Sequence, residues 1–164
     1  MILDAAHWIE ATALSTHIRE SIWSYPIIQS AHVLGLGWFA GLTLVMDLRL
    51  VGVALRSIAV GTVMSRLLPW IRWGFALMVV TGVLLTIATP VTFYSNPFFR
   101  AKLVLLVLAG VNVAVFHTTL YPAVERWGGA STPPVRARIA GTASILLWIG
   151  IIVTGRLVAY NWFQ

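Results

Sequence analysis

Two histidines lie in or directly after long apolar stretches of the chain. His32 lies in the stretch 27–46, which carries no formal charge, and His117 follows the apolar residues 103–116. An imidazole is costly in hydrocarbon, so it should face protein, water or a ligand. Imidazole nitrogen is also a common ligand of haem iron. We therefore take His32 as a candidate axial ligand of haem b. His117 is either the ligand of a second site or a structural residue.

The depths of the two histidines argue against one shared haem. They lie towards opposite sides of the membrane, so their depths differ by about 13 Å or more at 1.5 Å per residue. The two axial nitrogens on one iron are only about 4 Å apart. If both histidines bind haem, there are two sites, and each needs a further ligand. For His32 the candidates are His7, His17 or the His32 of a second copy. For His117 the candidate is Met46.

Several polar residues have both a functional and a structural interpretation. Arg156 lies near the outer end of the last apolar stretch, where a guanidinium is suited to hold haem propionates. The alternative is that Arg156 only reaches to the membrane surface. His32 is alternatively a neutral histidine bonded to a neighbouring helix. Asp47 is most simply one half of an ion pair with Arg49, Arg72 or Arg138.

The composition is that of an integral membrane protein. Of 164 residues, 59% are hydrophobic and 10% are charged, whereas soluble domains carry about 25% charged residues. The chain has no cysteine, which excludes disulfides, iron–sulfur clusters and thiolate zinc sites. The net charge of +6 does not indicate nucleic-acid binding, because the basic residues lie at the ends of apolar stretches. Nucleotide-binding loops, serine-hydrolase elbows and zinc-protease motifs are absent, and whether the chain is an enzyme stays open.

The apolar pattern predicts one all-α domain over residues 1–164, a four-helix transmembrane bundle with an N-terminal amphipathic interfacial helix. Leu14, Ile18 and Ile22 recur every four residues and predict the interfacial helix over about 5–23. The spans are expected over about 25–56, 69–91, 97–121 and 138–160.

Local signals refine these spans. Pro69 is predicted as the first helical position of the second span, and Asn96 as the N-cap of the third. Gly37 and Gly41 form a GxxxG pair, which lets another helix come close.

Basic residues are more frequent on one side of the predicted spans. That side carries Arg49, Arg56, Arg66, Arg72, Arg126, Arg136 and Arg138. The opposite side carries Arg19, Arg100, Lys102 and Arg156, together with Asp4, Glu10 and Glu20. The positive-inside rule therefore predicts a multi-pass protein of the bacterial inner membrane with both termini in the periplasm.

Four segments resemble an uncharacterised family of small bacterial four-span membrane proteins, known as a domain of unknown function. They are RESIWSYPIIQSAHVLGLGWFAGLTLVMDLRLVG, LPWIRWGFALMVVTGVLL, NPFFRAKLVLLVLAGVNVAVFH and RIAGTASILLWIGIIVTGRLVAY. The resemblance covers about Arg19 to Tyr160 and implies four helices in a bacterial inner membrane, with no activity attached. The matching polar positions are His32, Asp47, Arg49, Asn96, Lys102, Asn112, His117, Arg138 and Arg156.

The stretch from His32 to Gly41 is also similar to the first helix of copper-resistance-D proteins and of haem b-binding four-helix membrane proteins. Those cytochromes pair histidines at matched depths, from which this chain departs. Three functions follow as hypotheses. The first is a haem b-binding redox protein or the membrane subunit of a redox complex. The others are a copper or small-solute permease or its accessory, and a non-catalytic assembly subunit that packs on itself or on a membrane partner.

Overall fold

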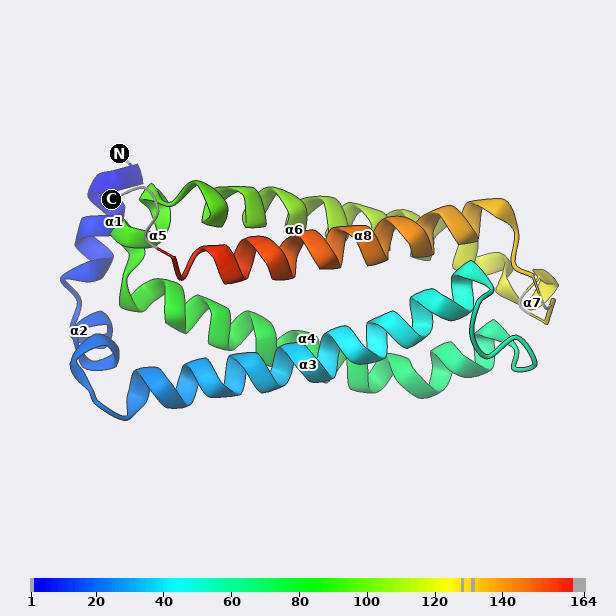
Figure 1. The fold of residues 1–164 in the computed structure, drawn as a ribbon, viewed down its shortest axis with the longest axis horizontal. Helices are drawn as coiled ribbons and strands as arrows, with labels where there is room; N and C mark the ends of the chain where they lie inside the picture. Colours follow the sequence, from blue (N-terminus) through cyan, green and yellow to red (C-terminus); the bar gives the residue numbers. More distant parts are fainter. Residues whose placement is uncertain (1, 128, 131, 161–164) are drawn as a thin grey trace.

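Four long apolar helices form the body of the protein (Figure 1). The structure is a computed structural model and describes residues 2–127, 129–130 and 132–160. Each long helix is sufficiently long and apolar to cross a bilayer, and the described residues contain no strand. The predicted all-α transmembrane bundle is thereby confirmed. The four helices are α3 (Ser24–Val51), α4 (Val60–Ala88), α6 (Pro97–Val115) and α8 (Val135–Leu157).

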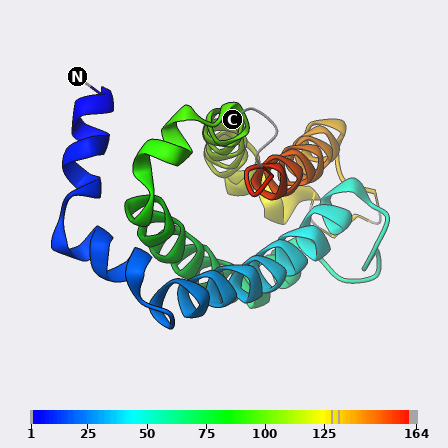
Figure 2. The same ribbon diagram turned by 60° about the vertical axis from the view of Figure 1, so that its left-hand side comes forward.

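The long helices form two pairs that meet along one seam. α3 packs against α4, α6 packs against α8, and α3 also packs against α8 (Figure 2). Only 11% to 33% of the most apolar window of each helix is buried inside the protein. The remaining surface is apolar, as hydrocarbon requires of a helix that faces lipid. We call the end where α3 begins and α8 ends the outer end, after the predicted orientation, and the opposite end the inner end.

The helix α4 begins earlier than the sequence predicts. It starts at Val60, so Pro69 lies inside the helix and not at its first position. Val60 and Met64 are buried against Met46 of α3 in the main apolar cluster of the inner end. The burial of these side chains extends the helix past the proline, whose missing N–H removes one hydrogen bond of the ladder. The predicted span over 69–91 was therefore too short at its first end.

The helix α3 ends before the predicted boundary at residue 56. Its C-cap is Gly52 with φ 85°, and the Gly52 N–H donates to the carbonyls of Leu48 and Arg49. A glycine in the left-handed region after the last turn is a common helix stop. The predicted start of the third span is confirmed, because Asn96 Oδ1 accepts hydrogen bonds from the Phe98 and Phe99 amides.

The predicted surface helix over 5–23 is two helices, α1 (Ile2–Glu10) and α2 (Ala13–Glu20), which cross the outer end of the bundle (Figure 1). Thr12 ends the continuity, because its hydroxyl caps α2 by accepting from the Ser15 amide. Ser15 is fully buried, and its hydroxyl donates to the Ala88 carbonyl at 3.2 Å. The Arg19 Nη1 donates to the same carbonyl at 3.3 Å. Both bonds fasten α2 to the outer end of α4.

The connection from α4 to α6 and the exit from α6 use short helices. α5 (Pro90–Ser95) joins the outer ends of α4 and α6. At the inner end, α6 continues as a π-helical turn, η1 (Phe116–Leu120), then a 3-10 turn, η2 (Tyr121–Ala123), and α7 (Val124–Trp127). The third span was predicted to end near residue 121, but the regular α-helix ends at Val115 and residue 121 lies in the irregular region.

Glycines make the close helix contacts, but not the pair that the sequence singled out. A Cβ at Gly141 of α8 would lie 3.0 Å from the Asp47 carbonyl and 3.0 Å from the Leu50 Cβ. No atom of a neighbouring element lies within 4 Å of a Cβ built at Gly37 or Gly41. The GxxxG pair therefore faces away from the other described helices, and the α3–α8 seam closes on Gly141.

We predict that Gly141→Ala lowers the thermal unfolding midpoint in detergent, because the added methyl meets backbone and Cβ atoms that cannot rotate away. Overpacking of this kind costs about 1–3 kcal/mol. Gly110→Ala on α6 is the control, since its Cβ position is open and alanine favours the helix by up to about 1 kcal/mol. Equal midpoints for the two variants would contradict the close α3–α8 seam.

Candidate functional site

His32 lies inside the outer half of the bundle, on the face of α3 that packs against α4. Its Nδ1 is 2.8 Å from the Thr81 Oγ1, and its Cε1 would be 3.3 Å from a Cβ at Gly82. The glycine therefore leaves room for the flat ring between the two helices. The structural interpretation of His32, a histidine bonded to a neighbouring helix, describes this contact.

The Thr81 hydroxyl determines which ring nitrogen of His32 carries the proton. It donates to the Leu77 carbonyl of its own helix at 2.6 Å, which uses its only hydrogen. The Thr81 oxygen must then accept from a protonated His32 Nδ1. In a neutral ring this leaves the lone pair on Nε2, for which the described residues supply no hydrogen-bond partner. A histidine whose Nδ1–H is held and whose Nε2 is free has the arrangement of a metal ligand.

Lys102 of α6 faces the same region from the other helix pair. Its Nζ would be 3.6 Å from a Cβ at Gly155 of α8. No ion pair or hydrogen bond joins Lys102 to another described residue. An ammonium inside a transmembrane bundle needs a counter-charge or water. The outer half of the bundle thus combines a free imidazole nitrogen with an uncompensated cation.

His117 lies on a different level and does not join His32. α3 and α6 begin at the same end (Figure 1), so His117 is deeper by about 18 Å at 1.5 Å per residue. Its Nδ1–H donates to the Val113 carbonyl at 3.0 Å, and Phe116 and Tyr121 flank the ring at 5.6 Å. Its Nε2 is therefore also the nitrogen with the lone pair. The π-helical turn that carries His117 is a form often found at functional sites.

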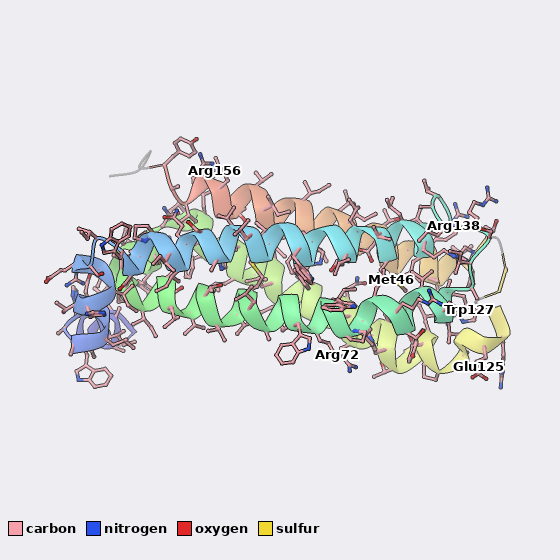
Figure 3. All side chains as sticks on the ribbon, turned by 90° about the horizontal axis from the view of Figure 1, so that it is seen from below. Met46, Arg72, Glu125, Trp127, Arg138 and Arg156 are labelled. Atoms are coloured by element: carbon pink, nitrogen blue, oxygen red, sulfur yellow. The ribbon has the colours of Figure 1, made fainter. Side chains whose placement is uncertain are left out.

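The remaining predicted ligands lie elsewhere. Arg156 is exposed at the outer end of α8, opposite Arg138 (Figure 3), and its guanidinium lies over the Tyr160 ring at 5.3 Å. His7 and His17 are exposed on α1 and α2. Met46 is buried in the inner apolar cluster. The described residues contain no group of three or more histidine and acidic side chains that would hold a metal ion.

The ion pair expected for Asp47 is not formed. Asp47 is 6% exposed, and its Oδ2 has no hydrogen-bond partner among the described residues. The fully buried Arg49 instead binds backbone carbonyls, with Nε donating to Ile58 at 2.8 Å and Nη2 to Ala130 at 3.0 Å. The guanidinium is therefore used to tie the α3–α4 loop to the segment before α8. The expectation was wrong because these two loops surround Arg49 and direct it away from the carboxylate.

A family described as a family of unknown function (DUF6644) matches residues 7–161. The chain belongs to this family. The expectation of an uncharacterised family is confirmed, because DUF6644 is a family of unknown function. The four candidate spans of the structure agree with the four helices that the resemblance implied. No curated protein and no solved structure matches the chain. The similarity to copper-resistance-D and haem b proteins stays a prediction.

Sequence reasoning missed Thr81 as the partner of His32. His32 and Thr81 lie about equally far from the outer ends of α3 and α4, so matched depth was a usable signal. It was not used, because a threonine in a span commonly bonds only to its own helix. Lys102 was placed only on the less basic side of the spans, because the sequence does not reveal which face of α6 points into the bundle.

We predict that Thr81→Val reduces the Nδ1–H form of His32, because the acceptor of that proton is lost. A lost hydrogen bond of about 1 kcal/mol corresponds to a roughly fivefold change in the tautomer ratio. Nitrogen-15 NMR of histidine-labelled protein measures the ratio. Thr86→Val is the control, because the Thr86 hydroxyl bonds only to the Gly82 carbonyl of its own helix. An unchanged His32 spectrum in Thr81→Val would contradict the contact.

Proposed function

We propose that this DUF6644 protein is a haem b-binding redox protein, or the membrane subunit of a redox complex, with His32 as an axial ligand. One contact carries the proposal: His32 Nδ1 lies 2.8 Å from the Thr81 Oγ1, whose own hydrogen is directed to the Leu77 carbonyl, and this arrangement favours a free lone pair on His32 Nε2. Few roles other than metal binding require a neutral imidazole inside a membrane span whose Nε2 has no protein partner.

The residues around His32 fit the polar parts of a haem. Lys102, near the outer end of α6, supplies a cation for a propionate carboxylate. Arg156 is the second candidate for a propionate, because it follows Gly155 and lies at the outer end. His117 is either the ligand of a second haem or a structural residue of the π-helical turn. Haem b, when bound, supplies a one-electron redox centre.

The bacterial inner membrane and periplasmic termini complete the proposal. Arg138 and Arg156 mark opposite ends of α8 (Figure 3), and the excess of arginine at the Arg138 end supports a cytoplasmic inner end. The orientation would place the His32 region in the periplasmic half of the membrane. An electron partner would then reach the haem most closely from the periplasmic side.

We predict that the purified protein, expressed with haem precursor supplied, shows Soret and α bands, and that His32→Ala removes them. His17→Ala is the matched control, since His17 is exposed on α2 and should leave the spectrum unchanged. His117→Ala tests the second site, because loss of about half of the haem would assign a ligand there. A wild-type protein that carries no Soret band under these conditions would refute haem binding.

A role as an assembly subunit is the second candidate, and the exposed glycine pair favours it. Gly37 and Gly41 contact no other described helix, and the neighbouring Val33, Leu34 and Val45 are exposed apolar side chains. Small residues of this spacing let two backbones approach closely in lipid. The same face on a second copy of the chain is the simplest partner, because α3 is then its own complement.

We predict that replacing both Gly37 and Gly41 with leucine shifts the purified protein from dimer to monomer, because the added side chains separate the two α3 helices. Light scattering in detergent measures the mass. Gly110→Leu is the control, since Gly110 is exposed on α6 and its Cβ position is also open. A wild-type monomer in native-lipid particles would remove this candidate.

A further inference from the structure

The seam between α3 and α8 holds a buried carboxylate that the haem proposal does not use. Phe39 of α3 packs edge-on against Trp148 of α8, with ring centroids 4.7 Å apart. Two turns further along α3, the Asp47 carbonyl lies at Gly141 of α8. The Asp47 carboxylate lies within this seam, and Ser144 of α8 is its side-chain hydrogen-bond partner. Both residues are 6% exposed.

Two oxygen atoms on the same face of α3 lack partners at this place. Asp47 Oδ2 and Thr43 Oγ1 are buried, and neither has a hydrogen-bond partner among the described residues. Thr43 precedes Asp47 by four residues, so the two side chains are neighbours on the helix surface. They do not bond to each other. Other threonines of the bundle satisfy their hydroxyls within their own helix, as Thr154 does at the Gly150 carbonyl, 2.7 Å away.

The chemistry of this group is that of a small cation site. Buried charges in proteins are paired or coordinate metals, and Asp47 Oδ2 has no hydrogen-bond partner, basic or otherwise, among the described residues. The arginine two residues further along α3, Arg49, is directed to the carbonyls of Ile58 and Ala130. A carboxylate and two hydroxyl oxygens form a hard, all-oxygen donor set. One carboxylate neutralises one positive charge, which favours a monovalent over a divalent ion in a poorly solvated seam.

The Asp47 carboxylate lies close to the inner end of the bundle, from which an ion could reach it. Asp47 lies four residues before the end of α3 at Val51, which is about 6 Å at 1.5 Å per residue. Asp47 also lies about 30 Å along α3 from Ile27, where the uncharged stretch begins. Because the hydrocarbon layer is about 30 Å thick, Asp47 lies at its inner edge. Arg138 is exposed beside Val51 in a shallow surface groove.

We propose that Asp47, Thr43 and Ser144 form a binding site for a monovalent metal cation, entered from the inner end of the bundle. The site is independent of haem at His32, which lies four turns away along α3. Binding of the ion satisfies the two orphaned oxygens together and fixes α3 against α8. The ion therefore stabilises the seam on which the two helix pairs meet.

Equilibrium binding of radioactive Na⁺ to purified protein in lipid nanodiscs tests the proposal, with choline chloride keeping the ionic strength constant. We expect saturable binding of about one Na⁺ per chain, as one carboxylate neutralises one charge. Asp47→Asn should abolish the binding, and Thr43→Val should raise the half-saturating concentration by about tenfold. Thr154→Val is the control and should bind as the wild type does, because Thr154 lies ten residues beyond Ser144 on α8 and its hydroxyl bonds to the Gly150 carbonyl of its own helix.

A second measurement needs no variant. Replacing choline by Na⁺ at constant ionic strength should raise the thermal midpoint of the wild-type protein in a saturable way. His32→Ala should keep the Na⁺ effect, which separates this site from the haem proposal. Wild-type protein without saturable Na⁺ binding, or binding retained in Asp47→Asn, would overturn the proposal. A midpoint that responds to pH and not to Na⁺ would also overturn it, since Asp47 would then bind only a proton.

Discussion

Hydrocarbon offers no hydrogen bonds, so each polar side chain inside this bundle must find its partner in the protein. Most do so within one helix, as Thr86 and Thr154 do at carbonyls one turn back. The contacts that cross between helices are fewer and link neighbouring helices. His32 bonds to Thr81 across α3 and α4, and Asn112 bonds to the Ala140 carbonyl across α6 and α8. The groups left without partners lie where a ligand is chemically reasonable.

The class and the number of spans were predictable, because long uncharged stretches have few other uses in a chain with 10% charged residues. Local chemistry also predicted the start of α6, where Asn96 caps the helix and Pro97 follows. Helix ends that depend on contacts between distant segments were not predictable. The start of α4 at Val60 follows from burial against Met46, which the order of residues alone does not state.

The residues of the candidate site also differ in how far the sequence could predict them. His32 was recognisable because an imidazole in a span is expensive. Its partner Thr81 and the cation Lys102 come from helices whose facing sides are set only by packing. Asp47 was recognised as unusual, but its expected ion pair required knowing the loops that surround Arg49. A sequence therefore reveals the costly group more readily than the group that satisfies it.

The attachment of α2 to α4 has a consequence for how the protein is made. The Ala88 carbonyl, which receives Ser15 and Arg19, lies 73 residues after Ser15 in the chain. The N-terminal helices leave the ribosome before that carbonyl has been synthesised. Ser15 is fully buried in the finished molecule, so it must wait at the membrane surface until the second span has been inserted. Docking of α2 is thus a late step of biogenesis, which requires that the α3–α4 hairpin is complete.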